Sequence, residues 1–130
     1  MEVKNFLLVS EKFLPAFEKL LRKEIPAKTC LQLSAAYDEI VSQITVVQRT
    51  RKAIAEKYAA KNEDGTVKID ELGNVVFPDD ETKTKALKEI DEILNESLEL
   101  ALNKVVLNPE DKMTTEEYIM LRDIVEIPEG

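Results

Sequence analysis

The chain has 130 residues, including three glycines, one cysteine and no histidine, with 34% charged residues and a formal net charge of −8. This length predicts one domain with a modest core, and the low glycine and aromatic content favours an elongated helical protein over a β-sandwich or an α/β enzyme. Without histidine, Ser-His and Cys-His catalytic pairs and His-containing metal sites are excluded in this chain.

The location of the protein is predicted from its cysteine and its apolar segments. Cys30 is the only cysteine, so no disulfide forms within the chain and a reducing compartment is the simplest location. We expect Cys30 to be a small buried side chain rather than a reactive thiol. The apolar run at residues 6–9 is too short for a secretory signal, and no apolar stretch reaches membrane-spanning length. We therefore expect an intracellular protein.

Charge is distributed unevenly along the chain. Residues 1–61 carry 11 basic and 7 acidic side chains, whereas residues 62–130 carry 7 basic and 19 acidic ones. The two halves either pack together and partly neutralise each other, or the second half presents an acidic face to a basic partner. The overall negative charge argues against general nucleic-acid binding.

The N-terminal segment predicts one short helix. Residues 3–9 fit either a short strand or the approach to this helix. Ser10 is a suitable N-cap, and a row of apolar side chains predicts a helix over residues 10–23 that ends before Pro26. The apolar side chains of this row are Phe13, Leu14, Phe17, Leu20 and Leu21.

The longest predicted element is a helix over residues 27–61. Its inward-facing positions are separated alternately by three and four residues, which is typical of a helix that packs along another helix. We call these positions the seam: Cys30, Leu33, Tyr37, Ile40, Ile44, Val47, Arg51, Ile54 and Tyr58. Arg51 is the only charged seam residue. Its head should reach the edge of the seam or pair with a carboxylate on the facing helix.

The next segment predicts a β-hairpin over residues 66–77. Asn62-Glu63-Asp64-Gly65 has the composition of a turn, and apolar and polar side chains then alternate on both sides of a second turn at Leu72-Gly73-Asn74. An isolated hairpin is marginal in water, so this one should lean on the helix ends, a second copy or a partner. The aspartates near the turns lack the spacing of a calcium loop, so no metal site is predicted.

Two further helices are predicted in the acidic half. A leucine-rich pattern predicts a helix over residues 79–104 that returns antiparallel along the second half of the long helix. A loop containing Pro109 follows. The T-x-x-E pattern of Thr114 and Glu117 is typical of a capping box and predicts a last helix over residues 114–125.

The chain end leaves an alternative open. Residues 127–130 should form a tail, although residues 124–127 also fit a short strand beside residues 3–9. The complete order of elements predicts a mainly α fold in one helical domain. Its centre is an antiparallel, coiled-coil-like helical hairpin with a β-hairpin inserted between the two long helices, and short helices lie at both ends. A prefoldin subunit shares this layout only as an architectural analogy.

Several short sequence signatures occur along the chain, in the same order as the predicted elements. They are Leu14-Pro15, Ile25-Pro26-Ala27-Lys28, Ile54-Ala55-Glu56-Lys57-Tyr58, Glu63-Asp64-Gly65, Leu72-Gly73-Asn74 and the segment from Thr114 to Leu121. With these signatures, most of the chain resembles a family of small uncharacterised proteins from tailed bacteriophages. The resemblance implies a phage or prophage origin and brings no established activity or site residues.

The sequence predicts no enzyme and no catalytic, cofactor or metal site, because histidine is absent and the glycines are too far apart for a phosphate-binding loop. Three hypotheses remain. The protein binds and modulates or inhibits a host or phage protein, such as a defence or transcription component. Alternatively, it is a phage structural or assembly-chaperone protein that acts through homo-oligomerisation. The third hypothesis, a small-ligand protein or enzyme, has the least support.

Five residues are candidates for partner binding. Arg49 and Arg51 lie in the basic end of the long helix, and Leu72, Gly73 and Asn74 lie at the predicted hairpin tip. A tip exposed at the end of a rigid helical pair is a natural contact point, whereas the simpler alternative is a plain connection. We expect a protein partner in the host bacterial cytoplasm, with self-association as the alternative, and neither a membrane nor a nucleic acid as partner.

Overall fold

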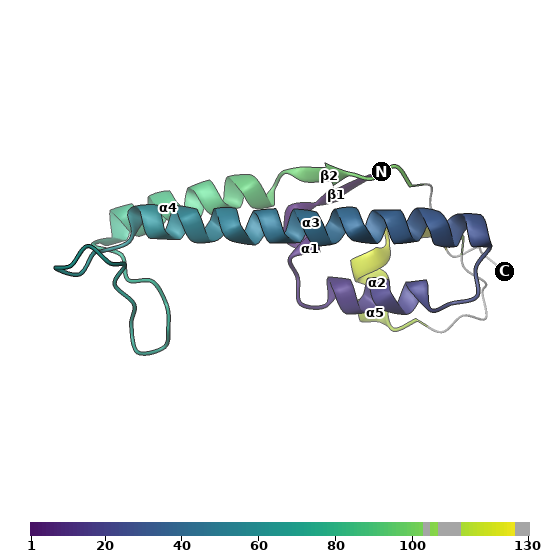
Figure 1. The fold of residues 1–130 in the computed structure, drawn as a ribbon, viewed down its shortest axis with the longest axis horizontal. Coiled ribbons are helices and arrows are strands. Elements are labelled where there is room, and N and C mark those ends of the chain that lie inside the picture. Colours follow the sequence, from purple (N-terminus) through teal and green to yellow (C-terminus); the bar gives the residue numbers. More distant parts are fainter. Residues whose placement is uncertain (103–104, 107–112, 127–130) are drawn as a thin grey trace.

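The computed structural model describes residues 1–102, 105–106 and 113–126, and this part of the chain is mainly helical with four short strands (Figure 1). The helices are α1 Asn5–Leu8, α2 Phe13–Leu21, α3 Ala27–Tyr58, α4 Asp80–Leu94 and α5 Thr115–Leu121. The strands are β1 Glu2–Lys4, β2 Ser97–Glu99, β3 Val105–Val106 and β4 Val125–Glu126. None of the helices in the described ranges is long and apolar enough to cross a membrane.

The long helix α3 extends over most of the length of the molecule (Figure 1). It has 32 residues and begins directly after Pro26, where the missing N–H needs no helical partner. Every seam residue is buried or half-buried, and Leu33, Ile40 and Val47 are the most deeply buried of them. The alternation of three and four residues therefore identified the side of α3 that packs against the rest of the chain.

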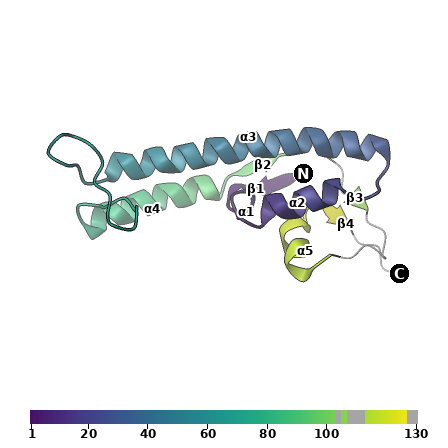
Figure 2. The same ribbon diagram turned by 60° about the horizontal axis from the view of Figure 1, so that its bottom comes forward.

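The first half of α3 belongs to a packed region that we call the head. It consists of this half, α1, α2, α5 and the four strands (Figure 2). Phe17 lies at its centre, fully buried, with its ring centroid 6.2 Å from that of Phe13 and 6.1 Å from that of Tyr37. The core continues through Leu20, Leu33, Ile40, Leu100, Leu121 and Ile124.

The second half of α3 and α4 lie side by side in both views and form, with residues 59–79, a region that we call the arm (Figures 1 and 2). Its buried apolar side chains are Val47, Ala59 and Ala86. The side chain of Asp79 caps α4 by accepting a hydrogen bond from the Thr82 backbone N–H at 2.7 Å. Thus the arm rests on fewer and smaller buried side chains than the head.

The first residues of the chain form both a short strand and the approach to a helix, the two alternatives predicted for residues 3–9. Glu2–Lys4 is strand β1, which pairs antiparallel with β2 so that Val3 lies opposite Leu98. Asn5–Leu8 is the one-turn helix α1, and α2 starts only at Phe13. The predicted helix over residues 10–23 is therefore shorter than expected, because residues 9–12 form a turn between two helices.

The predicted helix over residues 79–104 is wrong after Leu94. The chain leaves the helix at Asn95, and β2 follows. From Ser97 to Leu102, exposed positions alternate with half-buried or buried ones, and the leucines at 98, 100 and 102 lie on the covered side. This is the period of a strand. The predicted helical face included Leu98 and Leu102, because these leucines also fit a spacing of three and four residues.

The last helix is also shorter than predicted, because α5 ends at Leu121 and not near residue 125. Its predicted start is confirmed, since the hydroxyl oxygen of Thr114 accepts a hydrogen bond from the Glu117 backbone N–H at 3.1 Å. After a turn, β4 pairs in parallel with β3, not with the N-terminal strand. The predicted loop around Pro109 and the tail at residues 127–130 lie outside the described residues.

Residues 59–79 form two successive tight turns instead of one two-stranded hairpin. The predicted pairing over residues 66–77 is reduced to a single antiparallel bridge between Ile69 and Val75, and a second bridge joins Lys61 to Val67. Three backbone hydrogen bonds close the base of both turns. The Lys68 N–H donates to the Ala60 carbonyl oxygen at 2.9 Å, and the Val76 N–H donates to the Lys68 carbonyl oxygen at 3.0 Å. The Ala60 N–H donates to the Val76 carbonyl oxygen at 2.8 Å.

Candidate partner-binding site

The second turn, residues 70–74, holds three of the predicted binding residues. The Asp70 carboxylate accepts hydrogen bonds from the backbone N–H groups of Leu72 and Asn74, each at 2.9 Å. Gly73 has a φ of +82°, a conformation that glycine adopts at low cost and other residues disfavour. The turn is thus fixed by its own hydrogen bonds, and the Leu72 side chain is 87% exposed at its tip.

The first turn, residues 62–66, repeats the same design. The Asp64 carboxylate accepts hydrogen bonds from the Thr66 hydroxyl at 2.6 Å and from its backbone N–H at 3.0 Å, which lowers the pKa of Asp64. Gly65 has a φ of +85°. The two turns are eight residues apart, as are their two bridges. This repeat is visible in the sequence as Gly65-Thr66-Val67 and Gly73-Asn74-Val75, and the pattern-based prediction missed it.

Apolar side chains near the second turn remain open to solvent. Ile69 is 57% exposed, close to the tip residue Leu72, and neither contributes to the buried core. We call Ile69 and Leu72 the tip pair. Two large apolar side chains on one ordered turn, at the end of the arm farthest from the head, are a more specific feature than isolated exposed residues.

Arg49 and Arg51 do not belong to one site with the tip. Two residues two positions apart point to nearly opposite sides of a helix, and accordingly Arg49 is exposed whereas Arg51 is half-buried in the seam. Among the described residues, no hydrogen bond or ion pair links either arginine to the second turn or pairs Arg51 with a carboxylate on α4. Arg49 also lies about 14 Å before the end of α3.

Tyr58, in the last turn of α3, fastens the arm near its far end. The Tyr58 hydroxyl donates a hydrogen bond of 2.8 Å to the Glu89 carboxylate on α4, and this bond raises the pKa of Tyr58. Lys57 pairs with the same carboxylate at 3.7 Å and lies 5.0 Å from the centre of the Tyr58 ring. These contacts hold α3 against α4 where the two turns begin.

Asn5 connects the arm to the head, a role that no sequence pattern indicated. It is the buried polar residue of the described chain, only 2% exposed. Its side chain donates to the carbonyl oxygen of Ile93 at 2.8 Å and accepts from the Gln43 side chain at 2.9 Å. Its backbone N–H donates to the carbonyl oxygen of Glu96 at 2.8 Å. Asn5 therefore joins α1, α3 and the end of α4 at one point.

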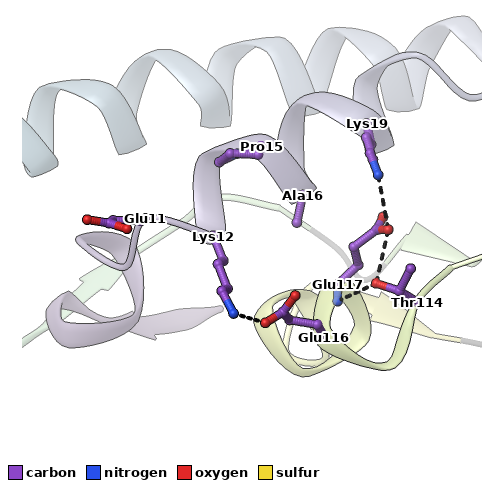
Figure 3. Close-up of a pocket in the computed structure, with 8 residues that line it drawn as sticks. All are labelled: Glu11, Lys12, Pro15, Ala16, Lys19, Thr114, Glu116 and Glu117. Atoms are coloured by element: carbon purple, nitrogen blue, oxygen red, sulfur yellow. Dashed lines mark hydrogen bonds and ion pairs between the residues drawn. The ribbon is translucent and has the colours of Figure 1, made fainter.

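A shallow pocket of about 290 Å³ lies between α2 and α5 in the head (Figure 3). Four of its five charged side chains are paired, since Lys12 pairs with Glu116 and the Lys19 ammonium lies 3.2 Å from the Glu117 carboxylate, whereas Glu11 points away from these pairs. Burial would raise the pKa of Glu117, but hydrogen bonds from Lys19 and Thr114 outweigh it and lower this pKa. The pocket is therefore a joint between two helices that two ion pairs connect.

Within the described ranges, no group of three or more cysteine, aspartate or glutamate side chains is arranged to hold a metal ion. Cys30 is half-buried, and its Sγ lies 3.7 Å from the carbonyl oxygen of Ile25. Comparisons with known protein families, curated proteins and solved structures found no match for the chain. Among the large apolar side chains of the described residues, Leu72 in the second turn is the most exposed.

Proposed function

We propose that the chain is a non-enzymatic protein-binding module that modulates or inhibits a host or phage protein through the tip of its arm. The observation that carries the proposal is the 87% exposure of Leu72 on a turn fixed by two hydrogen bonds to Asp70. A preorganised loop loses little conformational freedom on binding, so more of the contact energy contributes to affinity. With Ile69, Leu72 offers an apolar contact suited to a shallow pocket on a protein.

The biological setting of this proposal comes from the sequence resemblance. A phage or prophage origin would place the partner in an infected bacterium, for instance a defence or transcription component in the host cytoplasm. The surroundings of the tip pair are polar and include acidic side chains such as Asp70 and Glu71. These charges favour a partner whose apolar pocket has a basic rim.

The proposal is tested by quantitative affinity capture from bacterial lysate, before and after phage infection, with the tagged wild-type chain and Leu72→Asp as baits. The matched control is Leu87→Asp, because Leu87 is also an exposed leucine of the arm, on α4. We expect one protein to be retained in stoichiometric amount by the wild type and Leu87→Asp, and at least tenfold less by Leu72→Asp. Equal retention by both variants, or no retained protein, contradicts binding through the tip.

The alternative function, a phage structural or assembly-chaperone protein, would act through homo-oligomerisation. It is favoured by a row of exposed residues along α3, which lies at one edge of the part of the chain that the structure describes (Figure 2). Light scattering at high protein concentration tests the assembly role. A strict monomer would count against the assembly role and would leave binding through the tip unaffected.

A further inference from the structure

The side of α3 opposite the seam carries a continuous row of exposed residues. Successive members are three or four positions apart, so they lie in one line along the helix, over about 39 Å. We call this row the outer stripe: Leu31, Ala35, Glu39, Ser42, Val46, Arg49, Ala53 and Lys57, all exposed. Figure 2 shows α3 along one edge of the molecule.

The outer stripe is complementary to itself in the antiparallel direction. Its residues form pairs placed symmetrically about residue 44, and one of these pairs, Glu39 with Arg49, brings opposite charges together. The pairs are Leu31 with Lys57, Ala35 with Ala53, Glu39 with Arg49, and Ser42 with Val46. In a two-fold symmetric dimer each such pair occurs twice, because a residue of one copy meets its counterpart on the other. We propose that the outer stripe binds a second copy of this chain in antiparallel orientation.

Charge selects this orientation over the parallel one. Asp38 and Glu39 give the first half of the exposed side a negative charge, and Arg49 and Lys52 give the second half a positive charge. In a parallel pair, Glu39 would oppose Glu39 and Arg49 would oppose Arg49, which is unfavourable. Neither Glu39 nor Arg49 uses its side chain in a hydrogen bond or ion pair within the described chain, so both are available.

Shape supports the same occupant. A groove of about 500 Å³ runs beside the outer stripe between α3 and the β2 segment, with Glu39, Val46 and Glu99 among its lining residues. A second groove of about 200 Å³ continues it past Leu31 and Ala101. Both grooves have acidic side chains and no basic ones in their lining. The basic half of an antiparallel second α3 would therefore meet a complementary surface.

The interface is of a size that predicts a reversible dimer. Ala35, Ser42 and Ala53 are small, so two helices can approach to about 8–10 Å between their axes. Leu31, which is 72% exposed in the single chain, would lie near Lys57 of the second copy, whose ammonium pairs with Glu89 of its own chain. The stripe and grooves supply fewer than the roughly 20–30 residues per partner of a standard interface. We expect a dissociation constant in the micromolar range, which corresponds to a binding free energy on the order of −8 kcal/mol.

A charge-exchange experiment tests this dimer and its orientation together. Sedimentation velocity of the wild type, with a chain mass of 14.8 kDa, should give twice that mass above the dissociation constant. Glu39→Arg and Arg49→Glu should each weaken self-association at least tenfold, because each places like charges opposite one another at both ends of the interface. An equimolar mixture of the two variants should form a heterodimer, since every opposed pair then has opposite charges.

The control is Glu92→Arg, which makes the same charge change at an exposed position of α4. This variant should dimerise like the wild type, and circular dichroism should show equal helix content in all variants. A wild type that stays monomeric overturns the proposal. So do single variants that dimerise as well as the wild type, or a mixture that stays monomeric. Leu72→Asp should leave the dimer intact, so failure of the tip contact and failure of this interface are distinguishable.

Discussion

The head and the arm are held together by different means although α3 runs through both. In the head, large side chains such as Phe13, Phe17 and Leu33 are fully buried, whereas two of the three buried apolar side chains of the arm are alanines. The arm depends on the length of α3, on the Tyr58–Glu89 hydrogen bond and on ion pairs that are largely exposed. A helix that continues out of a packed core can thus support a region that has little core of its own.

This difference predicts separate stabilities within one chain. Local opening costs least where few apolar side chains are buried, so the arm should open more often than the head. Both proposed contacts involve the arm, since its tip carries the tip pair and its half of α3 carries the basic part of the outer stripe. The head then acts as the support that orients these surfaces.

The largest effect is expected for Phe17→Ala. Phe17 is fully buried and contacts two other aromatic rings, so its loss leaves a cavity at the centre of the head. We expect the free energy of unfolding to fall by about 3–5 kcal/mol, measured by urea denaturation. Leu87→Ala on the arm is the control and should cost less than about 0.5 kcal/mol, because Leu87 is 49% exposed. Similar losses in the free energy of unfolding for Phe17→Ala and Leu87→Ala would contradict the division into a well-packed head and a weakly packed arm.

The next effect concerns the connection between the two regions. Asn5→Ala removes both side-chain hydrogen bonds of Asn5 and leaves the carbonyl oxygen of Ile93 and the amide of Gln43 without them. We expect a loss of about 3 kcal/mol in the free energy of unfolding. Ser10→Ala is a suitable comparison, since the Ser10 hydroxyl accepts only an exposed hydrogen bond of 3.4 Å. If Asn5→Ala costs no more than this control, Asn5 does not join the regions.

A smaller, local effect is expected for Gly73→Ala in the second turn. A methyl group at this position meets open space, so the cost comes only from the positive φ and should be about 1 kcal/mol. The change should alter the nuclear magnetic resonance shifts of residues 70–74 and leave those of α2 and α5 unchanged. Shifts that spread into the head would show that the turn is coupled to the core.

The smallest effect is a difference in acid sensitivity between helix starts. Backbone and hydroxyl hydrogen bonds from Thr82 lower the pKa of Asp79 at the start of α4, and Lys19 and Thr114 lower that of Glu117 in α5. A lowered folded-state pKa stabilises the fold above the unfolded-state pKa of about 4, and this stabilisation is lost as the pH falls through the folded-state value.

Asp79→Asn and Glu117→Gln remove these charges and should flatten the fall in melting temperature between about pH 5 and pH 2. The Asp79 change should act on the arm, and the Glu117 change on the head. Asp91→Asn is the control, because Asp91 is exposed and its carboxylate makes no such bond in the described chain. This change should leave the pH profile unchanged. A profile insensitive to all three changes would contradict the assigned roles.

The parts of the fold that depend on local periodicity were predictable from the sequence. The seam of α3 and the start of α5 at Thr114 follow from spacing and capping, which operate within a few residues. The end of α4 was not predictable with the pattern used, because Leu94 and Leu98 fit a helical face while Leu98, Leu100 and Leu102 fit a strand. Leu98 pairs with Val3 of β1, 95 positions earlier in the chain, and this long-range pairing stabilises the strand.

The candidate site was predicted only in part for the same reason. Glycine and asparagine at residues 73–74 indicated a turn, and its exposed leucine followed from the composition. The first turn was also predicted, from the composition of residues 62–65, but its eight-residue relation to the second turn was not. Asn5 could not be found, because its partners Gln43 and Ile93 come from two distant helices. Arg49 and Arg51 remain predicted contact residues, but they point to different sides of α3, because residues two positions apart diverge around a helix.

The most direct test of the account is hydrogen–deuterium exchange resolved by segment, on the Glu39→Arg variant so that a second copy does not cover α3. The account predicts slow exchange in α2, α5 and the first half of α3, with free energies of opening close to that of global unfolding. The amides of α4 and of residues 60–76 should exchange at least tenfold faster. Equal protection of α4 and α2 would contradict the claim that the arm is a separate, less stable contact region.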